Sequence, residues 1–299
     1  GLGAFAEVLA EADLLVLVGR KPDVGLRFAE PPVIAETCRL ILVDPEQGVL
    51  EQFGGRLAET QRLSGSELAD PVPTLERLIQ RANDEPVGDP GWRTAAREAV
   101  AFRPPEWAGQ AADEGSPLHP VQLARAVHEN LAVAEESVFI SDGGEFGQWS
   151  QAVVGSTYRL INGPSGSIGS GVPFALAARL ACPEARIIST VGDGTVGFHA
   201  MEWDTAVRCN LPLVIVVGND ACWNAEYQIQ LQDYGPDRLV GCELAPTRYD
   251  EVCRALGGWG ERVERAADLP GALERAVASG QPACVDVRIA RVPAPIVRR

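Results

Sequence analysis

Short runs of consecutive apolar residues alternate along this chain with longer stretches in which apolar positions recur every three or four residues. In the first third, the apolar runs are Leu14 to Val18 and Leu40 to Val43, and the second ends on Asp44. Continuous apolar runs are typical of strands buried on both faces, and the amphipathic stretches between them predict helices. The pattern therefore predicts a parallel sheet covered by helices.

The same alternation continues beyond position 117. The amphipathic stretch HPVQLARAVHENLAV predicts a helix, and the apolar runs in SVFISDG, ARIISTVGDG, LPLVIVVGND and PACVDVRIA predict strands separated by further helices. Alternating strands and helices fold into a doubly wound α/β sheet, whose ligands bind at the carboxyl ends of the strands.

Two α/β domains with doubly wound parallel sheets are therefore expected. We assign residues 1–82 to a partial Rossmann-like domain and residues 118–290 to a second domain. Residues 83–117 are rich in Pro, Gly, Asp and Glu and form the predicted linker, although GWRTAAREAVAFR within it has a helical pattern. Residues 291–299 form a basic C-terminal tail.

Acidic side chains lie where two strands of the second domain end. Asp193 stands between two glycines after one strand, and Asp220 follows Asn219 at the end of the next. A strand–helix–strand unit returns the chain to the same edge of a parallel sheet, so we expect the two carboxylates to be neighbours. Mg²⁺ prefers oxygen ligands and often takes one or two carboxylates plus phosphate oxygens. The helix expected to begin near Phe198 would direct its N-terminus at such a phosphate.

This pattern also has a simpler interpretation, because Gly-Asp-Gly turns and strand-end Asn-Asp pairs are common in ordinary loops.

Composition narrows the possible ligands. A formal net charge of -15 makes nucleic acid and anionic membranes poor partners for the surface as a whole, so an anionic ligand must be captured locally. The seven cysteines are scattered, which predicts reduced and mostly buried thiols in a cytoplasmic protein.

The stretch GDGTVGFHAMEWDTAVRCNLPLVIVVGND resembles the thiamine-diphosphate motif, in which Gly-Asp-Gly is followed by a helix, a strand and Asn-Asn or Asn-Asp. It is similar to the acetolactate synthase, benzaldehyde lyase and oxalyl-CoA decarboxylase superfamily, and GNDACW resembles the 2-hydroxyacyl-CoA lyase branch. The resemblance covers essentially all 299 residues. It implies thiamine diphosphate and Mg²⁺ as cofactors, with residues 1–82 as part of the family's middle domain and residues 118–290 as its diphosphate-binding domain.

The family's pyrimidine-binding domain is absent from this sequence, which has no initiator methionine. That domain supplies the glutamate that activates the cofactor and half of each active site. The resemblance therefore implies a chain that is catalytically incomplete alone, a partner that carries the pyrimidine-binding domain on another chain or a missing N-terminal segment, and a dimer or tetramer. The family commonly has Asn where this chain has Asp220, which keeps an oxygen ligand for the metal.

The resemblance assigns site residues at three glycine turns and at the strand end that carries Asn219 and Asp220. Asp193, Asp220 and a backbone carbonyl near Cys222 are the implied metal ligands. Ile168 is expected to support the bent cofactor from below, although it also fits a plain core residue. The implied cofactor-binding residues are Gly143, Gly144, Glu145, Phe146, Gly166, Ser167, Ile168, Gly192, Asp193, Gly194, Thr195, Asp220, Cys222, Trp223 and Asn224.

Other residues carry looser expectations. Glu226, near Trp223 and Tyr227, is the expected catalytic acid or base, unless it is a solvated helix-face carboxylate. His199 stands near the diphosphate turn, and Met201 and Trp203 are expected in the core. In the acyl-CoA members of the family a mobile C-terminal segment covers the CoA, so the tail arginines are candidate ligands for its phosphates, unless the tail is disordered. They are Arg291, Arg298 and Arg299.

The activity implied by the resemblance is carbon–carbon cleavage of a 2-hydroxyacyl-CoA to a ketone or aldehyde and formyl-CoA, through the thiamine-diphosphate ylide. An acetolactate-synthase-like or oxalyl-CoA-decarboxylase-like enzyme is the nearest alternative. A non-catalytic, nucleotide-binding regulatory subunit is the alternative from another class, and the presence of Asp193, Asp220 and Ile168 argues against it.

Overall fold

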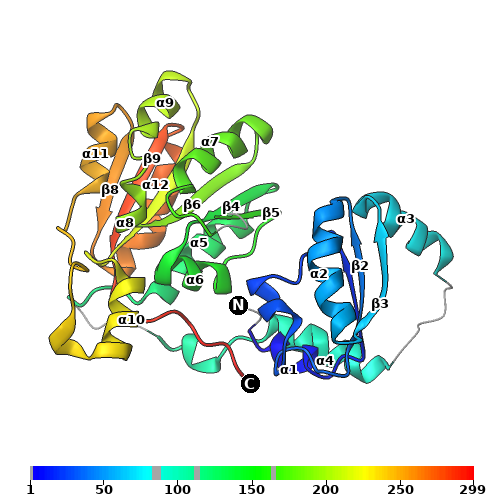
Figure 1. The fold of residues 1–299 in the computed structure, drawn as a ribbon. Helices are drawn as coiled ribbons and strands as arrows, with labels where there is room; N and C mark the ends of the chain where they lie inside the picture. The colour runs from blue at the N-terminus through cyan, green and yellow to red at the C-terminus, as the bar shows by residue number, and fades with distance from the viewer. Residues whose placement is uncertain (1–2, 83–88, 111–114, 163–165) are drawn as a thin grey trace. The chain divides into compact units, whose positions relative to one another are not determined.

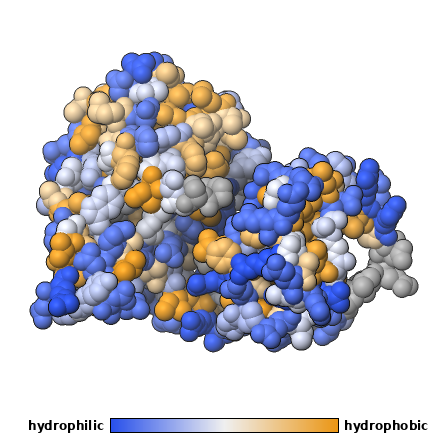
Figure 2. Space-filling view, in the orientation of Figure 1, coloured by the Kyte–Doolittle hydropathy of each residue, from blue (hydrophilic) through white to orange (hydrophobic). Residues whose placement is uncertain are grey.

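The computed structural model describes residues 3–82, 89–110, 115–162 and 166–299, which divide into two compact units (Figure 1). One unit comprises the chain up to residue 105 together with residues 296–299, and the other comprises residues 106–295. On the face shown in Figure 2, hydrophilic and hydrophobic residues are interspersed in both.

The first unit contains a three-stranded parallel sheet in the order β1-β2-β3. The apolar-run predictions for its first two strands are confirmed, because β1 is Leu14–Val18 and β2 is Arg39–Asp44. The third strand, β3 at Leu63–Leu68, has the mixed sequence LSGSEL and mostly exposed residues, so no apolar run marked it. The helices are α1 (Phe5–Leu9), α2 (Gln47–Glu59), α3 (Pro71–Arg81) and α4 (Pro90–Ala101).

Helix α4 lies inside the region predicted as a linker and corresponds to the helical pattern of GWRTAAREAVAFR. It packs in the first unit, so this part of the predicted linker belongs to that unit. Ala99 of α4 is 2% exposed and belongs to one apolar cluster with Ala4 and Val8. The chain passes to the second unit at residue 106, and the last four residues return to the first.

The second unit is built on a six-stranded parallel sheet in the order β5-β4-β6-β7-β9-β8, which confirms the predicted α/β class (Figure 1). The chain moves outward from β4 to β5 and then crosses back to β6, which puts the reversal of strand order between β4 and β6. The strands are β4 (Ser137–Ser141), β5 (Tyr158–Ile161), β6 (Arg186–Gly192), β7 (Leu213–Asn219), β8 (Trp259–Val263) and β9 (Pro282–Arg288).

Helices cover both faces of this sheet because successive strand residues point to opposite sides. Phe139 of β4 joins one apolar cluster, and its neighbours Val138 and Ile140 join the other. Helices α5 and α12 pack in the first cluster, and α7, α9 and α11 pack in the second. The helices are α5 (Pro120–Ala132), α6 (Gly144–Val153), α7 (Gly171–Ala181), α8 (Asp193–Val196), α9 (Glu202–Arg208), α10 (Asn224–Tyr234), α11 (Tyr249–Ala255) and α12 (Leu269–Ala278).

Two details after β6 differ from the sequence prediction. The expected helix start near Phe198 is wrong: the one-turn helix α8 begins at Asp193, and α9 begins at Glu202. Gly197 ends α8, and the residues up to Met201 form a turn. Trp203 is fully buried as expected, whereas Met201 is 67% exposed, because it lies in this turn rather than on the inner face of a helix.

Candidate metal and diphosphate site

Two acidic side chains meet at the carboxyl edge of the six-stranded sheet. Strands β6 and β7 pair with Gly192 opposite Gly218, which brings the turns that follow them to the same level. Asp193 is 3% exposed, and its Oδ2 atom is buried without a hydrogen-bond partner in the described part of the chain. A buried carboxylate oxygen with no donor is unfavourable unless a cation or proton satisfies it.

The pKa values of both carboxyl groups of the pair are raised. Burial raises the pKa of Asp193 to about 6. Burial also raises the pKa of Asp220 to about 8, and the negative charge of Asp193 contributes to that increase. Two carboxylates that repel each other in a poorly solvated site are stabilised when a divalent cation binds between them.

The backbone at Cys222 serves both carboxylates. Hydrogen bonding to its N–H lowers the pKa of Asp193 and of Asp220, against the larger effect of burial. Burial raises the pKa of the Cys222 thiol to about 12, so the thiol stays protonated at neutral pH. A protonated thiol is a poor metal ligand, which leaves the backbone carbonyl as the group at this position that suits Mg²⁺.

A glycine loop before α7 is fixed to the end of β4 by Asp142, a residue that is not among the predicted site residues. Asp142 is fully buried, and its carboxylate accepts backbone N–H bonds from Gly143 at 2.7 Å, from Gly169 at 3.0 and 3.1 Å, and from Gly171 at 2.9 Å. Since Asp142 ends one strand beside the reversal of strand order, this carboxylate holds two glycine turns together at the expected ligand edge.

Gly169 has to be glycine at the centre of that loop. Its φ is +94°, and a Cβ atom there would stand 2.7 Å from Cβ of Phe198. His199 Nδ1 lies 2.8 Å from the Gly169 carbonyl oxygen, so the turn after α8 contacts this loop through His199. The adjacent Ile168 is 39% exposed, so it is not a core residue. Gly166 and Ser167 precede it and are exposed, while residues 163–165 lie outside the described part of the chain.

Two glutamates lie near each other at the same edge. Glu226, in the first turn of α10, is exposed, and α10 buries none of its residues. Glu145, in the first turn of α6, has a raised pKa because it is partly buried and because Glu226 is negatively charged. Glu145 Oε2 is buried without a partner among the residues that the structure describes. The acid or base role of Glu226 stays a prediction.

The remaining predicted residues lie in the turn that carries Asp193 and in the first turn of α6. Gly192 caps α8, and Thr195 Oγ1 donates a hydrogen bond of 3.1 Å to the Gly192 carbonyl oxygen. Gly194 lies against Trp223, whose ring atoms would be 2.7 Å from a Cβ at that position. Gly144 has φ +79°, and Phe146 is 5% exposed under the sheet edge.

The predicted tail arginines have separate positions. Arg291 Nε and Nη2 donate to the backbone carbonyls of Asp220 and Ala221, and its guanidinium pairs with Glu243 at 2.7 and 2.8 Å. Arg299 belongs to the first unit, where its side chain is 3.8 Å from Glu98. Arg298 is exposed in the first unit. Their binding to CoA stays a prediction.

The chain beyond Arg291 also contacts site elements. The Val292 carbonyl accepts a hydrogen bond of 3.1 Å from Asn224 Nδ2, and the Pro293 carbonyl accepts one of 2.9 Å from Trp149 Nε1. The tail is therefore docked along α6 and α10 over this part of its length, in the second unit.

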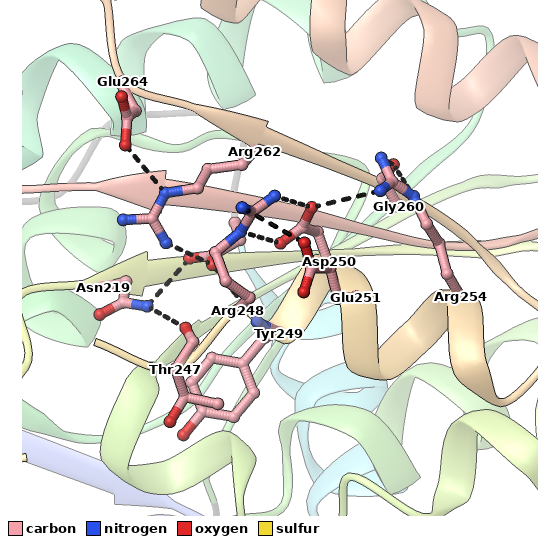
Figure 3. A network of polar contacts seen from close by, with 11 residues as sticks. Asn219, Thr247, Arg248, Tyr249, Asp250, Glu251, Arg254, Gly260, Arg262 and Glu264 are labelled. Atoms are coloured by element: carbon pink, nitrogen blue, oxygen red, sulfur yellow. Dashed lines mark hydrogen bonds and ion pairs between the residues drawn. The ribbon is translucent and has the colours of Figure 1, made fainter. Parts of the chain in front are cut away.

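A network of hydrogen bonds and ion pairs includes Asn219, the last residue of β7, and residues from the neighbouring strands and α11 (Figure 3). Asn219, Thr247 and Arg262 gather there, and Asn219 Nδ2 donates to the Thr247 carbonyl at 2.9 Å. Asp286 of β9 is fully buried and accepts from Asn219 at 3.1 Å and from Arg262 at 3.0 Å. The sequence signal for this network is the single Asp in the apolar run PACVDVRIA.

The network reaches the metal site through Tyr249, at the start of α11. Its backbone N–H donates to Asp286 at 3.3 Å, and its hydroxyl donates to the backbone carbonyl of Asp193 at 2.8 Å. Beside it, Arg248 makes two bonds of 2.8 Å to the fully buried Asp250. Buried charged groups need such partners, and here they fix the Asp193 turn and the Asn219 side chain relative to one sheet.

A cavity of about 930 Å³ lies at the opposite edge of the same sheet, near the amino ends of the strands. Its arginines, Arg179 and Arg186, donate to backbone carbonyls of Pro212 and Asn130. Groups committed to the backbone offer little to a ligand, so we place the site at the carboxyl edge. Among the residues described, no group of three or more His, Cys, Asp or Glu side chains is arranged to hold a metal, so two carboxylates would need backbone and phosphate oxygens to complete a coordination shell.

Residues 142–287 match the family model described as thiamine pyrophosphate enzyme, C-terminal TPP binding domain. This part of the chain belongs to that family. Thiamine pyrophosphate is the same compound as thiamine diphosphate, so the predicted family and the predicted cofactor are supported together. No helix among the described residues is long and apolar enough to cross a bilayer.

Relatives extend over nearly the whole chain. A probable acetolactate synthase of Mycobacterium bovis is 36% identical over 297 residues, which are 95% of this chain and 50% of that protein. The human protein named 2-hydroxyacyl-CoA lyase 2 is 28% identical over 292 residues, covering 95% of this chain and 45% of that protein. The chain thus spans about half the length of these relatives.

A solved structure has the same fold. The thiamine diphosphate-dependent 4-hydroxybenzoylformate decarboxylase of Rhodococcus jostii RHA1 superposes with a TM-score of 0.71 over 95% of this chain and 50% of that chain, at 21% sequence identity. At that identity the likeness concerns the fold.

Proposed function

We propose that the second unit binds Mg²⁺ and thiamine diphosphate at the carboxyl edge of its sheet. The observation that carries this proposal is the Asp193–Asp220 pair, in which both pKa values are raised and one buried oxygen has no partner among the described residues. Asp193, Asp220 and the backbone carbonyl of Cys222 would hold the metal, and the diphosphate oxygens would complete its shell.

The loops around this pair suit a diphosphate. The first turn of α6 begins after Gly143, and its unpaired backbone N–H groups favour an anion. Asp142 fixes the neighbouring loop, which presents Ile168 at the edge, where an exposed apolar side chain can contact the organic part of the cofactor. When bound, the cofactor supplies a nucleophilic carbon and accepts the electron pair of a cleaved carbon–carbon bond.

For the reaction, we propose carbon–carbon cleavage of a 2-hydroxyacyl-CoA. The GNDACW sequence and the relatives named 2-hydroxyacyl-CoA lyase 2 support this choice. In this proposal Glu226 exchanges a proton with the substrate hydroxyl, and Glu145 sets the charge around it. An acetolactate-synthase-like reaction is the second candidate, and the higher identity over the full chain, 36%, favours it.

The whole enzyme would need the half that this sequence lacks. Because the relatives are about twice as long, we propose that a pyrimidine-binding domain, from another chain or another segment, completes the active site in a dimer or tetramer. The CoA moiety would then lie near the C-terminal segment.

The experiment has two stages. The first titrates the 299-residue chain with thiamine diphosphate in the presence and absence of Mg²⁺, and Mg²⁺-dependent binding is expected. The second adds the polypeptide that supplies the other half and offers either a 2-hydroxyacyl-CoA or pyruvate. Release of formyl-CoA supports the lyase, and turnover of pyruvate without turnover of the acyl-CoA contradicts it. Glu226→Gln should bind the cofactor normally and turn over more slowly.

A further inference from the structure

The turn that carries Asp220 contains a backbone conformation that its sequence does not favour. Ala221 has φ +54°, in the left-handed region, where a Cβ atom crowds the backbone. Glycine adopts this region freely and alanine rarely does, so other contacts must hold Ala221 there. One such contact is local, because the Ala221 N–H donates to Asn219 Oδ1 at 3.3 Å.

Arg291 binds two backbone carbonyls of this turn. Its Nε donates to the Asp220 carbonyl at 2.8 Å, and its Nη2 donates to the Ala221 carbonyl at 2.8 Å. Two successive carbonyls bound by one planar guanidinium fix the peptide orientation on both sides of the Ala221 Cα atom. Arg291 and Asp220 are 71 residues apart in the sequence, so this bond ties the segment after β9 to the turn after β7.

The guanidinium is itself held from the other side. Glu243 binds it through both carboxylate oxygens, at 2.7 and 2.8 Å. Glu243 also forms an isolated antiparallel bridge with Cys222, the residue after Ala221. The ring of Tyr227 lies 5.8 Å from the guanidinium carbon. The position of Arg291 is thus determined by the segments that follow the turn.

We propose that Arg291 is a positioning residue for the metal site: it keeps Ala221 left-handed and thereby directs the Asp220 side chain and the Cys222 backbone toward Asp193. The proposal rests on the proposed function, since it concerns the same metal site. It also changes the expected role of Arg291. Arginine has five N–H donors, and four of them are used in these bonds, which leaves little for a CoA phosphate.

The test combines Arg291→Gln with Ala221→Gly in the 299-residue chain. The probe is thiamine diphosphate with Mg²⁺, titrated by calorimetry or by the change in tryptophan fluorescence, with circular dichroism as the check of folding. Arg291→Gln is expected to weaken cofactor binding about 10- to 100-fold, the range for residues that orient metal ligands. Glycine at 221 needs no clamp, so the double variant should recover about tenfold of that loss.

Arg265→Gln is the matched control. Arg265 also makes a two-bond ion pair, to Asp268 at 2.7 and 2.8 Å, but its side chain is 71% exposed. Its removal should leave the cofactor affinity unchanged. If Arg291→Gln does not fold, Arg291→Lys replaces it, because a single ammonium group cannot hold both carbonyls and the carboxylate in the same geometry.

Each result decides a separate point. Unchanged cofactor affinity in folded Arg291→Gln or Arg291→Lys overturns the proposal, and so does a loss that Ala221→Gly fails to recover. If Arg291→Gln binds CoA more weakly but binds thiamine diphosphate normally, Arg291 contacts the substrate directly and the positioning role is overturned. Absence of Mg²⁺-dependent binding by the unmodified chain, both alone and together with the polypeptide that supplies the other half, would instead remove the proposed function.

Discussion

Acidic residues at the carboxyl edges of the two sheets have different tasks. On the three-stranded sheet, Asp44 ends β2 and its Oδ1 accepts a hydrogen bond of 2.9 Å from the backbone of Glu46, which closes a local turn. On the six-stranded sheet, Asp193 keeps one buried oxygen without a partner among the described residues, and Asp220 repels it. Both Asp44 and Asp193 are at most 5% exposed, so burial alone does not distinguish them.

The difference lies in what the surroundings provide. The Asp44 carboxylate is satisfied within its own turn. The Asp193 and Asp220 turns are held by residues from far along the chain, including Tyr249 and Arg291, and these bind backbone carbonyls instead of neutralising the carboxylates. The candidate site therefore differs from an ordinary strand-end turn because one buried carboxylate oxygen stays unpaired among the described residues while the backbone around it is firmly held.

The largest effect should come from removing one member of the pair. Asp193→Asn is expected to weaken Mg²⁺-dependent binding of thiamine diphosphate about a thousandfold, because a neutral amide binds the metal far less well than a carboxylate. Calorimetric titration measures it. Asp44→Asn is the control at the other sheet and should leave the affinity unchanged; equal losses in both variants would show that the comparison is wrong.

Packing of the two sheets can be compared in the same way. Ile215, in the central strand β7, is fully buried, whereas Leu14 of β1 is 47% exposed. Ile215→Ala should cost about 2–5 kcal/mol of unfolding free energy, since it leaves a cavity in the core. Leu14→Ala should cost less than about 1 kcal/mol. Urea unfolding followed by circular dichroism measures both, and a Leu14 cost as large as that of Ile215 would contradict the packing described.

The raised pKa values predict a pH dependence with a definite sign. With a pKa of about 8 in the folded state against 3.8 in the unfolded state, Asp220 favours the metal-free fold at acidic pH, and this contribution is lost as pH rises from 3.8 to about 8. Mg²⁺ must displace that proton, so its affinity should rise about tenfold per pH unit between pH 6 and 8.

Titration of the chain with Mg²⁺ and thiamine diphosphate at pH 6, 7 and 8 measures this slope. Asp220→Asn has no proton to release, and its slope over the same range should be nearly flat. A slope equal to that of the unmodified chain would assign the proton to another group.

The smallest effect concerns the network behind the site. Tyr249→Phe keeps the ring and removes the hydroxyl that donates to the Asp193 carbonyl. Loss of one such hydrogen bond costs about 1 kcal/mol, so cofactor binding should weaken about fivefold. Calorimetry at fixed pH measures it, and an unchanged affinity would mean that the Asp193 turn is held without Tyr249.

In the six-stranded sheet, the strands that the sequence revealed and those it did not differ in position, whereas in the three-stranded sheet the edge strand β1 was predicted because it is the continuous apolar run LLVLV. Strands β4, β6, β7 and β9 occupy the inner positions of the six-stranded sheet, and their apolar runs were read directly. The strands that escaped notice were β3, β5 and β8, and each lies at a sheet edge. An edge strand is partly solvated and keeps polar residues, so its sequence is close to that of a loop.

The candidate site divides in a similar way. The sequence by itself determined that Asp193 and Asp220 follow strands and share an edge, because a strand–helix–strand unit fixes that geometry locally. Only the tertiary structure decided that Asp142 anchors the glycine loop, that Asp286 holds Asn219, and that Arg291 grips the Asp220 turn. These bonds join residues 29 to 71 positions apart in the sequence. A local pattern of apolar and polar residues does not show which distant polar group the fold will bring to a given backbone carbonyl or amide.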